Sequence, residues 1–68
     1  MSAEETELEM VQRHVRQGER TLANQRALIA RLGTLGRPTE EAEILLASFE
    51  DAQRMHEDHL ARIQGRQG

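Results

Sequence analysis

Apolar residues recur at alternating steps of three and four along two stretches of this 68-residue chain, and one short break separates the stretches. This spacing is the heptad pattern, which places apolar side chains along one side of an α-helix. In the first stretch the positions are Leu8, Val11, Val15, Gly18, Leu22, Gln25, Ile29 and Leu32. In the second stretch they are Ala42, Leu45, Phe49, Ala52, His56, His59 and Ile63. The pattern predicts an all-α protein built from two long helices.

The residues between the two stretches predict a short turn. Gly33 and Gly36 can each adopt the left-handed conformation that ends a helix, and Pro38 cannot continue one. Thr39 is a good N-cap for a second helix. We expect a single domain over residues 1–68, with a helix over about 6–32, a turn over 33–38, a helix over about 39–63 and a flexible C-terminus over 64–68. So short a turn makes the helices antiparallel neighbours, with residue i roughly opposite residue 72 − i.

The first helix contains two features that the heptad pattern leaves open. Ser2 and Thr6 each stand three residues before a glutamate, so either can start the helix with a capping box. Gly18 lies on the apolar line, where glycine destabilises a helix by up to about 1 kcal/mol relative to alanine. We expect Gly18 to allow close approach of a residue near Met55 or Ala52, and the alternative is a kink.

The apolar stripes are wider than a contact between two helices needs. Leu28, Leu46 and Leu60 flank the heptad lines, and we expect these leucines, with Phe49, to form an interface to another molecule. The simplest arrangement is a homodimer of hairpins that forms a four-helix bundle. The alternative is that an unknown protein partner covers the same surface. Parallel and antiparallel arrangements of the two hairpins fit the pattern equally.

Charge is distributed unevenly along the chain. Residues 10–37 carry six arginines and one glutamate, whereas residues 38–68 carry seven acidic residues and three arginines. In a hairpin the two halves attract each other and much of the basic field is cancelled. The alternative is a nucleic-acid contact by the arginine-rich face of the first helix, through Arg13, Arg16 and Arg20. No aromatic residue interleaves these arginines, so a stacking platform for single strands is absent from the sequence.

The chain contains few residues that could perform chemistry. It has no cysteine, and its two serines show no spacing to a histidine and a carboxylate that indicates a nucleophile. We therefore expect no catalytic residues, no cofactor and no enzyme activity. His14, His56 and His59 are the candidate metal ligands, because an antiparallel hairpin brings them toward its open end. The alternative is that these histidines are amphipathic residues at the edge of the helix contact.

Composition favours a cytoplasmic protein. No run approaches the ~20 apolar residues of a membrane-spanning helix, and the acidic first residues do not fit a signal peptide. We therefore expect no membrane partner. Taken together, the patterns predict a non-catalytic structural or regulatory module that acts by self-association and protein–protein contact.

The order of residues also resembles a known group of proteins. The stretch from His14 and Val15 through Gly18-Glu19-Arg20, followed by Gln25-Arg26, Leu28-Ile29, Leu32, Gly36, Thr39, Ala42-Glu43, Leu45-Leu46 and Phe49-Glu50, is similar to short alphaproteobacterial, rhizobial-type helical-hairpin proteins that have no assigned activity. The resemblance covers about residues 11–63. It implies a bacterial cytoplasmic setting and a hairpin fold, and it implies no catalytic or binding residues.

Overall fold

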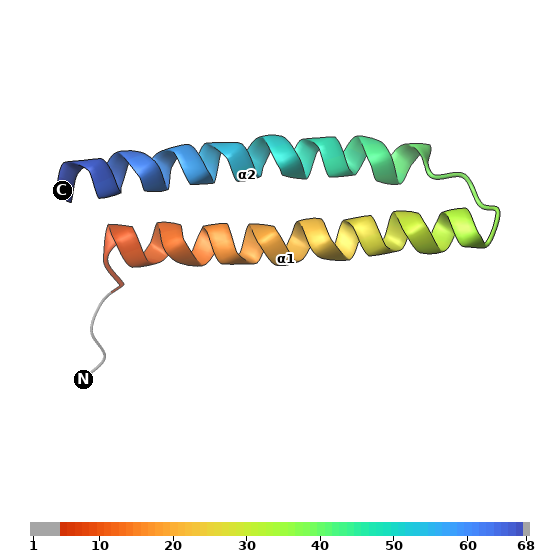
Figure 1. Cartoon of the computed structure of the whole chain (residues 1–68), viewed down its shortest axis with the longest axis horizontal. Coiled ribbons are helices and arrows are strands. Elements are labelled where there is room, and N and C mark those ends of the chain that lie inside the picture. The colour runs from red at the N-terminus through yellow and green to blue at the C-terminus, as the bar shows by residue number, and fades with distance from the viewer. Residues whose placement is uncertain (1–4, 68) are drawn as a thin grey trace.

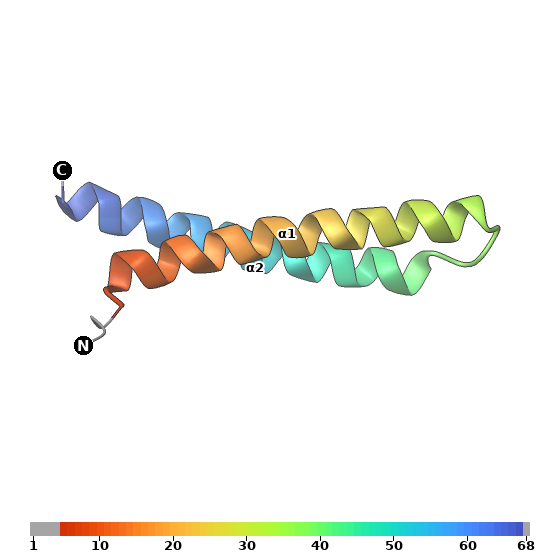
Figure 2. The same ribbon diagram turned by 90° about the horizontal axis from the view of Figure 1, so that it is seen from below.

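Two antiparallel helices joined by a turn make up the architecture of the described residues (Figure 1). The computed structural model describes residues 5–67, with α1 over Glu7–Thr34 and α2 over Glu40–Gln67. The two helices lie side by side over their full length and cross at a shallow angle, as the view turned by 90° shows (Figure 2). The molecule measures 49 Å along its longest axis and 14 Å along its shortest. It is therefore a single layer of two helices, with no second layer to cover either side.

α1 begins at the second of the two capping boxes in the sequence. The backbone N–H of Glu9 donates to Thr6 Oγ1 at 3.1 Å, and the backbone N–H of Thr6 donates to Glu9 Oε1 at 3.0 Å. Thr6 is extended, with φ −75° and ψ 164°, as an N-cap residue should be. Ser2, the other candidate, lies outside the described residues.

The turn uses Gly36 as its left-handed residue, with φ +69°. The Arg37 N–H donates to the Leu32 carbonyl at 2.8 Å and the Gly36 N–H to the Gly33 carbonyl at 3.1 Å, which satisfies carbonyl groups at the end of α1. Gly33 stays helical, so α1 ends two residues later than expected. Thr39 stands directly before α2, but its hydroxyl donates to Glu43 Oε2 at 2.6 Å.

The C-terminal end differs from the expectation of a helix that stops near residue 63. α2 continues as one helix to Gln67, and the expected flexible stretch over 64–67 is helical. A glycine such as Gly65 weakens a helix by about 1 kcal/mol but does not by itself end it. Arg66 lies in the last turn, where a cation stabilises the helix dipole, and its Nη2 lies 3.5 Å from Glu7 Oε1.

The contact line between the helices follows the predicted heptad positions on α1. All eight are buried or half-buried, and Val11 is the most enclosed at 1% exposed. On α2 the buried and half-buried positions include Ala42, Leu46, Phe49, Gln53, His56, Leu60 and Ile63. Of the seven expected positions on α2, six are buried or half-buried and Leu45 alone is exposed. Leu46, Gln53 and Leu60 lie inward as well, so the inward face of α2 is broader than the expected line. The sequence prediction missed Gln53 because glutamine is usually a surface residue.

Two glutamines connect the helices across this line. Gln25 Nε2 donates to the Ala42 carbonyl at 2.8 Å, and Gln53 Nε2 donates to the Val15 carbonyl at 3.0 Å. Both glutamine side chains are buried, and each bond is partly shielded from water. One glutamine comes from each helix. The pair therefore fixes how α1 and α2 align.

Gly18 allows Gln53 of α2 to pack directly against α1. A Cβ atom at Gly18 would lie 1.7 Å from Gln53 Oε1 and 2.6 Å from its Cδ. α1 passes through Gly18 without a break, so the glycine serves close packing and not a kink. The partner is Gln53, whereas we expected Met55 or Ala52.

We predict strong coupling between Gly18 and Gln53. In the native chain, Gly18→Ala displaces Gln53 and breaks its bond to Val15, which offsets or reverses the gain of up to about 1 kcal/mol that alanine brings to a helix. In a Gln53→Ala background the same substitution should stabilise the protein. Urea unfolding of the two single variants and the double variant measures the coupling, which we expect to reach about 1 kcal/mol. Additive effects would contradict the close packing.

Candidate interaction face

The hairpin encloses very little apolar surface. Among the described residues, only Val11 and Ile63 are buried hydrophobic side chains. Five large hydrophobic side chains are exposed, from 40% for Leu28 to 72% for Ile44. They are Leu28, Leu35, Ile44, Leu45 and Met55. A single layer of two helices thus leaves more large hydrophobic residues in water than in its core.

Three of the five exposed hydrophobic residues gather on one side of the hairpin. Leu28 on α1 and Ile44 and Leu45 on α2 line one open groove of about 900 Å³ near the turn. Met55 follows Ser48, which lines the same groove, by one heptad along α2, so helical spacing places it toward this side. Leu35 is the C-cap of α1 and does not line the groove. We call it the apolar side.

A second hollow opens beside the groove, nearer the middle of the helices. It has a volume of about 320 Å³, and the residues that line it are His14, Gln17, Gly18, Thr21, Phe49, Ala52, Gln53 and His56. None of these residues is an acid or an arginine. His14, Gln17 and Thr21 precede Leu28 at helical spacing, so the hollow belongs to the same side of α1 as the groove.

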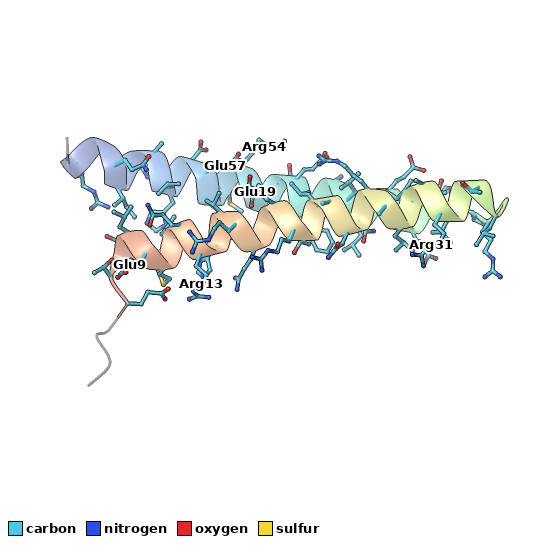
Figure 3. All side chains as sticks on the ribbon, turned by 60° about the horizontal axis from the view of Figure 1, so that its bottom comes forward. Glu9, Arg13, Glu19, Arg31, Arg54 and Glu57 are labelled. Atoms are coloured by element: carbon cyan, nitrogen blue, oxygen red, sulfur yellow. The ribbon has the colours of Figure 1, made fainter. Side chains whose placement is uncertain are left out.

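Charged residues occupy the other surfaces. Arg26 Nη2 lies 3.3 Å from Glu50 Oε2 in an ion pair that joins α1 to α2. Arg54 pairs with Asp51 along α2. In Figure 3, Arg13 projects away from α2, and Arg54 projects away from α1. Charges reach the groove itself only at the turn, through Arg37, Glu40 and Glu41.

The predicted interface residues divide between two environments. Leu46, Phe49 and Leu60 are half-buried, and Leu46 and Leu60 take part in the contact between α1 and α2. Leu28 is exposed on the apolar side. The sequence placed Ile44 among the residues expected to stay partly exposed on a lone hairpin, but it did not select Met55 for a surface. The recurrence of Ile44, Ser48 and Met55 at helical spacing was the signal that could have found Met55.

The predicted arginine face is partly neutralised. Arg13 donates to both carboxylate oxygens of Glu5, from Nε at 2.9 Å and from Nη2 at 2.8 Å. This forked hydrogen bond lowers the pKa of the Glu5 carboxyl and raises the pKa of Arg13. Within residues 5–67, Arg16 and Arg20 are exposed and form no ion pair.

The structure brings two of the three histidines together. The ring centres of His14 and His56 lie 5.4 Å apart, with the ring planes tilted by 42°. His59 instead faces Glu7, with Nε2 3.5 Å from Glu7 Oε2. Over the described part of the chain, no three His, Cys, Asp or Glu side chains gather as a metal site. The expected group of three is therefore a pair plus a separate residue.

Comparisons with known proteins add no assignment. No family model, curated protein or solved structure matches the chain. The resemblance to rhizobial-type hairpin proteins stays a prediction. In the helices that the structure describes, no segment has the length and apolar character needed to cross a bilayer.

We predict that Glu5 titrates below its ordinary pKa of 4.5 because Arg13 donates to its carboxylate. A lowered pKa in the folded state means that the ion pair stabilises the protein above pH 4.5 and that this stabilisation is lost as pH falls through the lowered pKa. NMR titration of the carboxyl carbon measures the midpoint. Arg13→Gln should return it to the ordinary value, and Arg20→Gln is the matched control that should not.

Proposed function

We propose that the protein is a non-catalytic helical module that acts through protein–protein contact, and that its first partner is a second copy of itself. The observation that carries this proposal is the groove lined by three exposed large hydrophobic residues, Leu28, Ile44 and Leu45, on one side of the hairpin. Among the described residues, the hairpin buries only two hydrophobic side chains. Exposed apolar patches of this kind are typical of interaction surfaces. A cytoplasmic setting remains the expectation from composition.

The dimensions of the apolar side suit a dimer. The hairpin is 49 Å long and two helices wide, which offers on the order of 1,000 Å² on one side. Stable protein interfaces bury roughly 800 Å² per partner. Two copies that meet on their apolar sides would form the four-helix bundle, with its second layer supplied by the partner.

The distribution of charge also favours a second copy. α1 carries most of the arginines, whereas α2 carries seven acidic residues and three arginines. A two-fold axis through the apolar side can place α1 of one copy beside α2 of the other. The rim of the interface then joins opposite charges, and the same arrangement is repeated on both edges.

We predict that Leu45→Glu breaks the dimer and leaves the hairpin helical. Leu45 is 46% exposed on the apolar side, so a buried charge there opposes association but not the fold. Leu46 is a poorer choice because it takes part in the contact between α1 and α2. Light-scattering mass over a concentration series, with circular dichroism on the same samples, measures both effects.

The matched control is Ala47→Glu, which adds the same charge to the same helix at an exposed position away from the apolar side. We expect it to keep the native mass. A native chain that stays monomeric at every concentration, or a Leu45→Glu variant that stays dimeric, would overturn the proposed self-association.

Nucleic-acid binding is the alternative function. The observation that supports it is the exposure of Arg16 and Arg20 on α1. Arg13 contributes less because Glu5 holds its guanidinium. Under the proposed function, we predict no salt-dependent retention of the chain on immobilised duplex DNA or RNA. Retention that weakens with salt and is lost in an Arg16→Gln/Arg20→Gln variant would favour the alternative.

A further inference from the structure

The hollow between α1 and α2 contains two buried polar atoms that have no hydrogen-bond partner. They are Gln53 Oε1 and His56 Nδ1. Both residues line the same hollow of about 320 Å³. Buried polar atoms are paired in most proteins, so two unpaired atoms in one hollow indicate a polar or ionic occupant.

The orientation of Gln53 is fixed by the fold. Its side chain is only 5% exposed, and its Nε2 donates to the Val15 carbonyl at 3.0 Å. The amide cannot turn over without losing that bond. Its Oε1 therefore stays an acceptor, held against Gly18 at the wall of the hollow.

The two imidazoles are spaced as ligands of one ion would be. Their ring centres lie 5.4 Å apart. A metal ion bound by a nitrogen of each ring at about 2.0–2.1 Å, with tetrahedral angles, keeps the ring centres roughly 5 Å apart. One histidine comes from each helix, so the ion would connect α1 to α2 directly.

We propose that this hollow binds a transition-metal dication of the zinc class through His14 and His56. Gln53 Oε1 is a buried, unpaired oxygen on a residue that lines the same hollow and is the candidate third ligand, and water completes the coordination. Imidazole nitrogen selects zinc, copper and nickel, whereas calcium and magnesium need carboxylates, which the lining of the hollow lacks. A single hairpin supplies every protein ligand, so the site does not depend on self-association.

The test is a zinc titration of the untagged, metal-stripped full chain, followed by the NMR signals of the histidine rings and by the melting temperature. We expect the His14 and His56 ring signals to shift while those of His59 stay in place. At saturation Tm should rise by at least about 4 °C, because an ion that binds only the folded state stabilises it. Magnesium at the same concentration should produce neither change.

Variants locate the site. His14→Gln and His56→Gln should each weaken zinc binding at least tenfold, and each variant is compared with and without zinc so that a change in its own stability does not obscure the result. His59→Gln is the matched control, since His59 lies on the same helix but faces Glu7. We expect it to bind zinc as the native chain does.

The proposal is overturned if no histidine signal shifts, if all three shift alike, or if His59→Gln weakens binding as much as the other two variants. An unshifted spectrum would assign the hollow to water. Light-scattering mass on the same samples keeps the two proposals apart. A monomer that binds zinc contradicts only self-association, and a dimer that does not bind zinc contradicts only the metal site.

Discussion

Gln25 and Gln53 reach from one helix to the backbone of the other, and the alignment of the hairpin depends on these two bonds. Each needs a close approach of the helices, which small residues provide: Gly18 lies against Gln53, and Ala42 accepts from Gln25. The other positions on the contact line are mostly larger apolar residues, and a single layer of two helices leaves most of them only half-buried. Alignment is therefore well specified, while apolar burial within one hairpin is small.

Helix pairing was predictable from the sequence because the heptad steps on α1 are unbroken, and every one of those positions lies inward. The alignment on α2 was less accessible. Six of the seven expected positions lie inward, but Leu45 is exposed and the buried Gln53 was missed. Glutamine is usually a surface residue, so its burial here was not predicted. It depends on a hydrogen bond to the Val15 carbonyl, which belongs to the other helix.

The apolar side could not be predicted from the sequence for a related reason. A heptad pattern shows which residues of a helix face its neighbour. It does not show which residues beside that contact line on one helix lie next to which residues on the other. Leu28 and Leu45 share a groove only once the two helices are aligned. The same holds for His14 and His56, which are 42 positions apart in the chain and meet across the hairpin, while His59, three residues further on, turns to Glu7.

The hollow and the groove belong to one side of the hairpin, which couples the two proposals physically. A second copy that covers the apolar side also covers the hollow between His14 and His56. By linkage, an ion in the hollow then changes the affinity of one copy for another by the same factor as association changes the affinity for the ion. An ion that fixes α1 against α2 makes the apolar side more rigid before the copies meet, so less conformational freedom is lost on association. If water can still bind the ion after the second copy covers the hollow, zinc increases the affinity of one copy for another. If apolar side chains of the second copy displace these water ligands, zinc decreases that affinity.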